Sequence, residues 1–242
     1  MCETCGCADP HTVPVELYDR ILSVNETQAA HNREHFRGQG ILAINLMGSP
    51  GSGKTAILEA TARALAGRWP VAAIAGDLET ERDAERLRAA GIPARAITTG
   101  NACHLDAAMV HHALHHDSLR HARVLFVENV GNLVCPAVYD LGQAFNAVAL
   151  AVTEGEDKPL KYPVMFRKAD VVLVTKVDLL PYLDFRLDVL TEALQQVMPR
   201  PVVFPVSARS GEGLDRWYRW IEERQRDLPA PATAPVPHRH GA

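Results

Sequence analysis

The chain has 242 residues, enough for one large α/β domain with short tails but tight for two domains. Its formal net charge of −4 argues against a nucleic-acid partner, and a hydrophobic content of 47% allows a sizeable core. No run of about 18 apolar residues and no basic, apolar leader is present, so we expect neither a membrane span nor a signal peptide. The expected compartment is the cytoplasm, where clustered cysteines are more often metal ligands than disulfides.

The two ends of the chain differ in composition from the middle. Residues 1–14 are polar and are predicted to form a flexible tail. Residues 15–36 carry apolar side chains at loosely helical spacing, which predicts one or two amphipathic helices at the start of a domain over residues 15–228. Residues 229–242 are rich in proline and are predicted to be disordered.

Apolar stretches alternate with helical segments through the middle of the chain. Strands are predicted at 41–47, 71–75, 94–98, 124–127, 147–152, 171–175 and 202–206, and helices at 54–66, 80–90, 104–119, 184–197 and 213–227. This alternation indicates βαβ units, so we predict an α/β fold with a mostly parallel, doubly wound sheet of about seven strands flanked by helices. In such sheets the ligand lies beyond the carboxyl ends of the strands.

A phosphate-binding loop follows the first predicted strand. Residues 48–55, GSPGSGKT, match GxxxxGK[ST] between a strand and a helix, which predicts a P-loop NTPase. Backbone N–H groups would surround the phosphates, Lys54 would reach the β- and γ-phosphates, and the Thr55 hydroxyl would ligate Mg²⁺. The residues predicted to bind nucleotide here are Gly48, Gly51, Ser52, Gly53, Lys54 and Thr55.

Two later segments favour guanine over adenine. Thr175-Lys176-Val177-Asp178 resembles the guanine motif NKxD, with threonine in place of the usual asparagine, and Ser207-Ala208 resembles the second guanine loop. The Asp178 carboxylate can accept two hydrogen bonds from guanine, whereas adenine lacks that donor pair. The alternative is an ATP-dependent small-molecule kinase.

Hydrolysis is assigned to the segment after the strand at 124–127. Glu128 can hold a Mg²⁺-bound water, and the Gly131 N–H can bond the γ-phosphate. Asp77 is a second candidate for the magnesium shell and Asp83 a weaker one. Asn132 stands where fast small GTPases have glutamine, so we expect slow turnover.

Cysteine and histidine form two candidate metal sites. Cys103, His104 and Cys135 flank the nucleotide segments and suit Zn²⁺ or Ni²⁺, completed by water or across a two-fold axis; the alternative is two buried core cysteines. At the N-terminus, Cys2, Cys5 and Cys7 can converge on one nickel ion, with a redox CxxC as the competing interpretation.

Further histidines are more ambiguous. His111, His112, His115 and His116 lie in one predicted helix and indicate either a metal relay or, as we favour, a solvated face. His238 and His240 could bind metal weakly.

The chain resembles the hydrogenase nickel-incorporation GTPases of the HypB family from about Val15 to the final helix. The stretches that carry the resemblance are GSPGSGKT, GDLETERDA, GNACHLDA, FVENVGNLVCP, TEGEDKPLKYPVMF and TKVDLLPY, with CETCGC similar to a nickel motif that some members have. The resemblance implies a GTPase metallochaperone that uses GTP and Mg²⁺ and binds Ni²⁺ or Zn²⁺ at Cys103, His104 and Cys135.

The same resemblance implies partners. They are a second copy of the chain, bound in a nucleotide-dependent way near Lys158–Pro163, a hydrogenase-maturation protein and the hydrogenase large subunit. The chain lacks the long histidine run that some relatives use for storage. A urease-accessory GTPase and a passive nickel-storage protein are the alternatives.

Overall fold

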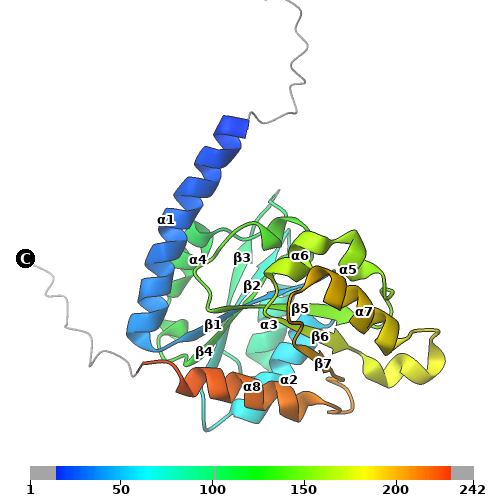
Figure 1. The fold of residues 1–242 in the computed structure, drawn as a ribbon. Coiled ribbons are helices and arrows are strands. Elements are labelled where there is room, and N and C mark those ends of the chain that lie inside the picture. The colour runs from blue at the N-terminus through cyan, green and yellow to red at the C-terminus, as the bar shows by residue number, and fades with distance from the viewer. Residues whose placement is uncertain (1–14, 101, 230–242) are drawn as a thin grey trace, which may run out of the picture.

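The computed structural model describes residues 15–100 and 102–229, which contain one seven-stranded sheet in the order β3-β2-β4-β1-β5-β6-β7 (Figure 1). Every neighbouring pair is parallel. The strands are β1 (Leu42–Met47), β2 (Val71–Asp77), β3 (Ala94–Thr98), β4 (Val124–Glu128), β5 (Phe145–Ala151), β6 (Val171–Thr175) and β7 (Val203–Pro205). The predicted fold class is confirmed.

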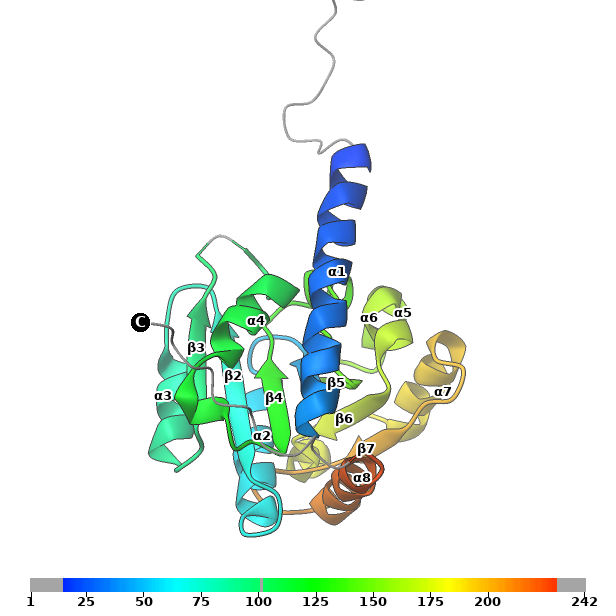
Figure 2. The same cartoon turned by 90° about the vertical axis from the view of Figure 1, so that its left-hand side faces the viewer.

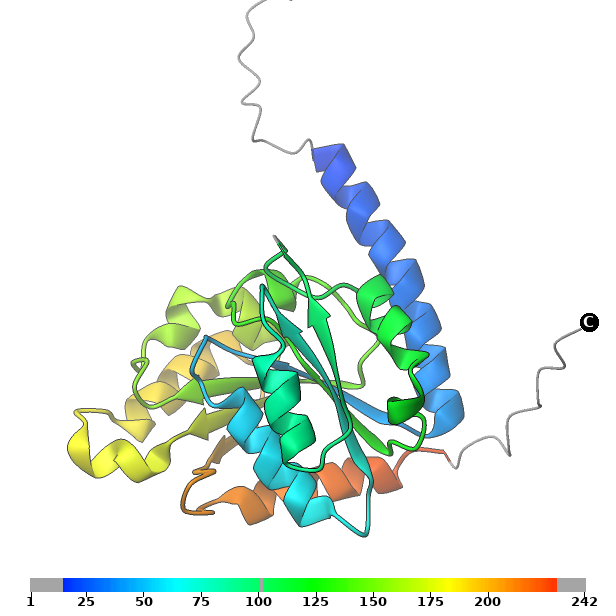
Figure 3. The same ribbon diagram turned by 180° about the vertical axis from the view of Figure 1, so that it is seen from behind.

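Helices cover both faces of the sheet. They are α1 (Val15–Gln39), α2 (Lys54–Leu65), α3 (Arg82–Ala89), α4 (Ala107–Leu114), α5 (Lys158–Lys161), α6 (Pro163–Lys168), α7 (Leu187–Val197) and α8 (Leu214–Arg226). Side chains of α2, α3 and α8 share one apolar core, whereas α1 and α4, with α6 and α7 beside them, pack on the opposite face (Figures 2 and 3). The described helices are each too short or too polar to cross a membrane.

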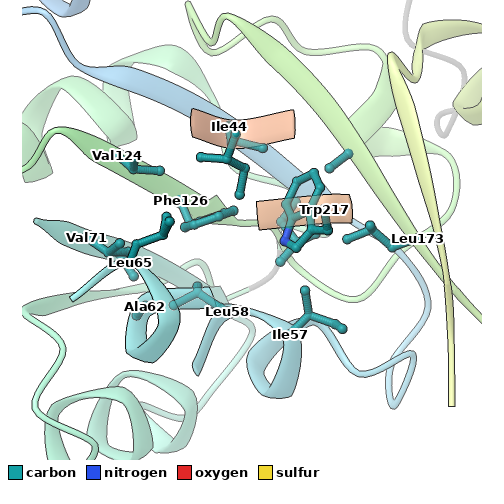
Figure 4. Close-up of a cluster of buried hydrophobic side chains, with 14 of the residues drawn as sticks. Ile44, Ile57, Leu58, Ala62, Leu65, Val71, Val124, Phe126, Leu173 and Trp217 are labelled. Carbon is teal, nitrogen blue, oxygen red and sulfur yellow. The ribbon is translucent and has the colours of Figure 1, made fainter. Parts of the chain in front are cut away.

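The central strands are apolar throughout because both of their faces are covered. Every residue of β1, β4 and β6 is buried, the pattern of a parallel sheet between helical layers. Trp217 of α8 packs among side chains of α2 and the strands (Figure 4). Its indole N–H donates to the Thr61 hydroxyl at 2.9 Å, which satisfies the polar end of a fully buried ring.

One helix prediction is wrong, and two short helices were not predicted. The prediction of one helix over 104–119 is wrong, because Asp106 caps α4 by accepting a hydrogen bond from the Met109 N–H at 2.7 Å, and the helix ends at Leu114. Residues 103–105 therefore form a loop. The N-terminal segment is one continuous helix, and the short helices α5 and α6, each with proline in its first turn, were not predicted.

Candidate nucleotide and metal site

The P-loop joins β1 to α2 at the carboxyl edge of the sheet. A Cβ on Gly48 would lie 2.3 Å from the carbonyl oxygen of Ala149, so this position admits only glycine. Lys54 is buried, and its Nζ donates to the carbonyl oxygens of Gly48 and Ser49, each at 3.2 Å. Burial lowers the pKa of Lys54, and the surrounding carboxylates, Glu128 foremost, act in the opposite direction.

Two carboxylates meet the hydroxyl of Thr55. Its Oγ1 lies 2.8 Å from Glu128 Oε1 and 3.1 Å from Asp83 Oδ1. Glu128 is 3% exposed, its Oε2 is buried without a hydrogen-bond partner among the described residues, and burial raises its pKa to about 7. Oxygen donors with one unsatisfied carboxylate oxygen fit a hard cation such as Mg²⁺.

Asp77 lies in a different environment at the end of β2. Its Oδ1 accepts hydrogen bonds from the N–H groups of Glu79 and Thr80, at 3.0 and 2.8 Å, and so closes the loop before α3. Asp83, the weaker candidate from sequence, is the one that contacts Thr55. A magnesium role for Asp77 stays a prediction.

The predicted guanine residues line one cavity next to the P-loop. The cavity has a volume of about 260 Å³, and its lining includes Gly53, Thr175, Lys176, Asp178, Ser207 and Ala208. The Ser207 hydroxyl donates to Asp178 Oδ1 at 2.6 Å, and the Thr175 hydroxyl donates to the Ser52 carbonyl at 2.6 Å. Thr175 therefore links β6 to the P-loop although it replaces the usual asparagine.

Lys176 has an unusual backbone in this cavity. Its φ of 61° is the single positive φ of a non-glycine residue in the described part of the chain. Such a conformation costs roughly 1 kcal/mol or more and clusters at ligand sites. The turn directs the chain from β6 into the segment that carries Asp178.

Cys103, His104 and Cys135 come together from two segments. Their ligand atoms lie within 4.8 Å of one another, all three residues are half-buried, and the Sγ atoms of the two free cysteines are 2.9 Å apart. Burial lowers the pKa of His104, which favours the neutral imidazole that a metal needs. Burial and the neighbouring Cys103 raise the pKa of Cys135 to about 11.

The segment after β4 joins this triad to the P-loop. Asn132 forms an isolated antiparallel bridge with Gly48, and a Cβ on Gly131 would lie 2.8 Å from Pro50 Cγ. Cys135 follows Gly131 by only four residues. The nucleotide and metal segments are therefore one continuous stretch of chain.

Two polar contacts of this region were not predicted from the sequence. Asn129 Oδ1 accepts from the Leu105 N–H at 3.1 Å and so ties the end of β4 to the loop that carries Cys103. Glu154 accepts a short hydrogen bond from the Ser49 hydroxyl and lies 3.7 Å from Lys158 Nζ. The sequence offered one signal for Asn129, because it directly follows Glu128. It offered none for Glu154, because that residue lies far from the P-loop in the sequence.

The N-terminal candidates Cys2, Cys5 and Cys7, and the C-terminal His238 and His240, lie outside the described residues. Their metal-binding roles stay predictions.

Comparison with known proteins identifies the family of the chain. The family model described as "CobW/HypB/UreG, nucleotide-binding domain" matches residues 42–205. The hydrogenase maturation factor HypB of Azotobacter vinelandii is 52% identical over 206 residues, 85% of this chain and 68% of that protein. The Escherichia coli K12 protein of the same name is 47% identical over 211 residues, 87% of this chain and 73% of that protein.

Solved structures give the same result. The crystal structure of Helicobacter pylori HypB in complex with nickel matches with a TM-score of 0.80 at 39% identity, covering 88% of this chain and 100% of that one. HypB from Archaeoglobus fulgidus matches with a TM-score of 0.78 at 36% identity, covering 84% and 100%. The chain belongs to the HypB family of hydrogenase maturation factors.

Proposed function

We propose that this protein is a GTP-hydrolysing nickel metallochaperone that assists nickel insertion into [NiFe]-hydrogenase. The observation that carries the proposal is the short segment from Glu128 to Cys135, which begins beside the P-loop threonine and ends in the Cys103–His104–Cys135 triad. The names of its relatives and the nickel-bound Helicobacter structure support it.

The phosphate side of the site has the groups that phosphoryl transfer needs. Backbone N–H groups of the P-loop and the Lys54 ammonium group would face the phosphates of a bound nucleotide, whose charged oxygens are better acceptors than the carbonyl groups that Lys54 contacts here. Thr55 with Glu128, and Asp83 or Asp77, would hold Mg²⁺, which would neutralise developing charge. The Gly131 N–H would bond the γ-phosphate, and Asn132 in place of glutamine makes turnover slow.

The base side selects GTP. Asp178, oriented by Ser207, would accept both guanine donors, and the Lys176 stem would cover the ring. With ATP, the Asp178 carboxylate would lose these partners, which disfavours adenine.

The metal triad is suited to hold and release nickel as cargo. Two thiols and one imidazole suit Ni²⁺ or Zn²⁺ but leave a coordination position for water or for a ligand from a second copy. A nucleotide-dependent homodimer in the cytoplasm, working with a maturation partner and the hydrogenase large subunit, follows from this role.

The test is to measure GTP and ATP hydrolysis and bound nickel for the wild type, Lys54→Ala, Cys135→Ser and the exposed control Lys168→Ala. We expect GTP hydrolysis well above ATP hydrolysis, lost in Lys54→Ala and kept in Lys168→Ala. Cys135→Ser should lose triad nickel while still binding GTP. The proposal is contradicted if the protein binds nickel but Lys54→Ala leaves hydrolysis unchanged, or if the wild type hydrolyses ATP and GTP equally.

A further inference from the structure

Helix α1 packs along α4 (Figure 2), and each of these helices brings a pair of histidines to the contact. His31 and His35 are one turn apart on α1, and His111 and His115 are one turn apart at the end of α4. The Nε2 atoms of His111 and His115 are 3.2 Å apart, and the His31 ring centroid lies 4.9 Å from that of His111. None of these residues takes part in the nucleotide site or the cysteine triad.

A buried asparagine fixes the orientation of the central histidine. The Asn32 amide N–H₂ donates to the carbonyl oxygens of Ala107 at 2.8 Å and Leu141 at 3.1 Å, so its Oδ1 is an acceptor, and it already accepts from the Gln28 amide at 3.3 Å. That oxygen lies 3.2 Å from His111 Nδ1, which therefore carries the proton. The lone pair of His111 is then on Nε2, which points to His115. A side-chain oxygen that holds the other ring N–H is the usual support of a metal-bound histidine.

The surroundings favour the neutral form of two of these rings, His35 and His111. Burial first, and then the neighbouring histidines, lower the pKa of His35 and His111. The histidines that act on His111 in this way are His115, His31, His35 and His112. A neutral imidazole offers a nitrogen lone pair to a cation that accepts one.

We propose that His31, His35, His111 and His115 form a second metal site, for a borderline divalent ion such as Ni²⁺, Zn²⁺ or Cu²⁺. Two nitrogens bound to one ion at about 2.0–2.1 Å, in tetrahedral or square-planar geometry, lie roughly 2.9–3.4 Å apart. The Nε2 separation of His111 and His115 falls in this range. His31 and His115 are exposed, so their rings can turn toward the ion.

The proposed site would join α1 to α4. The His31 and His35 rings come from one helix and those of His111 and His115 from the other, so a bound ion adds a link across this packing. Because folding brings the His31, His111 and His115 rings together and places His35 one turn from His31, the ion should bind the native state better than the unfolded state and raise the unfolding midpoint.

The test uses the full chain with Cys2, Cys5, Cys7, Cys103 and Cys135 changed to serine, so that thiols do not compete. Ni²⁺ and Cu²⁺ binding are measured by equilibrium dialysis, the ligands by nitrogen hyperfine structure in Cu²⁺ EPR, and stability by thermal unfolding. We expect nitrogen ligation and a higher midpoint with metal. The double variant His31→Gln/His115→Gln should bind one ion fewer, or roughly tenfold or more weakly, and lose the shift.

The same helix offers a matched control. His112 and His116 are exposed, and His116 Nδ1 is already bonded to Ser118, so His112→Gln/His116→Gln should bind metal as the parent does. His115→Gln alone, at an exposed position, should show the same direction of change as the first double variant. Thermal unfolding midpoints measured without metal show whether a variant has lost the metal site or has lost the stability of its fold. Equal affinity in the parent and the His31/His115 variant, or equal loss in the control, would overturn the proposal.

Discussion

Ionisation of the buried Glu128 carboxyl group opposes folding. The residue is 3% exposed, one of its oxygens has no hydrogen-bond partner in the described part of the chain, and its pKa is raised from 4.5 to about 7. Between these two values the native state holds a proton that the unfolded state has lost. The unfolding free energy therefore falls as the pH rises from about 4.5 to about 7 through this group, by roughly 3 kcal/mol in all.

Glu128→Gln should remove this part of the pH dependence. Since glutamine cannot ionise, the variant should be more stable than the wild type above pH 7, by up to roughly 3 kcal/mol, and should have lost GTP hydrolysis. Urea unfolding at several pH values between 4 and about 8 measures the first effect. Glu79→Gln, at an exposed position, is the control and should leave the profile unchanged. A variant with the wild-type pH slope would show that Glu128 is not the group responsible.

Asp178 carries the second prediction at this scale. Asp178→Asn should weaken GTP binding by roughly 2–4 kcal/mol, because the charged acceptor of both guanine donors is gone. Ser207→Ala is the matched variant: it removes the 2.6 Å hydrogen bond to Asp178 but keeps the carboxylate, so we expect a loss of roughly 1 kcal/mol. Calorimetric titration with GTP and ATP measures both. The assignment fails if the wild type binds the two nucleotides equally.

At the scale of elements, the turn after β4 is packed against the P-loop. A methyl group at Gly131 would lie 2.8 Å from Pro50 Cγ and 3.0 Å from Pro50 N, and neither the ring nor the backbone can move away easily. Gly131→Ala should therefore separate the turn from the P-loop, cost roughly 1–3 kcal/mol of stability and weaken GTP binding. Cys103 and His104 should keep their places, because the hydrogen bond from the Leu105 N–H to Asn129 is untouched, whereas Cys135 should move with the turn.

Unfolding and nucleotide titrations test this. Gly38→Ala serves as the control, since a methyl group there meets nothing within 4 Å and alanine favours the helix. Normal GTP affinity in Gly131→Ala would mean that the turn is not part of the nucleotide site.

The elements differ in how far the sequence could predict them. The strands and the P-loop were predictable, because apolar runs and a glycine-rich motif are local signals. The loop at Cys103 was not, because the cap at Asp106 competes with a continuous helical pattern. The contacts of Asp83 with Thr55 and of Glu154 with Ser49 join residues distant in sequence, so no local pattern contains them. For the same reason, the pairing of α1 histidines with those of α4 needed the structure.

At the scale of the whole molecule, we expect the N-terminal cysteines to bind nickel independently of the domain. Three thiolates within a short segment can converge on one ion without a fold. A chain that starts at Val15 should lose its tightest nickel site but keep GTP hydrolysis. Nickel titrations of the two chains measure this, and a Cys2→Ser/Cys5→Ser/Cys7→Ser variant of the full chain should behave like the shorter one. An unchanged nickel affinity would make the segment irrelevant.

The last prediction couples the two sites across the domain. Asn132 is bridged to Gly48 and Cys135 lies three residues further on, so a shift of this turn between the GTP and GDP states must move a triad ligand. On the other side, Asn129 holds the loop of Cys103 to the end of β4, so the remaining ligands stay with the sheet. The ligand geometry should then depend on the nucleotide.

If the bound nucleotide changes the affinity of the triad for a metal ion, then by linkage the metal ion changes the ratio of the GTP and GDP affinities by the same factor. Such a coupling free energy is typically about 1–3 kcal/mol. Nickel and zinc titrations of the GTP-analogue and GDP forms, in a chain that starts at Val15, measure this coupling. Cys135→Ser is the control and should bind metal equally in both forms. The coupling is contradicted if the parent binds metal with the same affinity in its GTP-analogue and GDP forms and metal does not change its rate of GTP hydrolysis. Coupling of the expected size would mean that hydrolysis itself resets the metal site, because the Gly131 turn that loses the γ-phosphate is the one that carries Cys135.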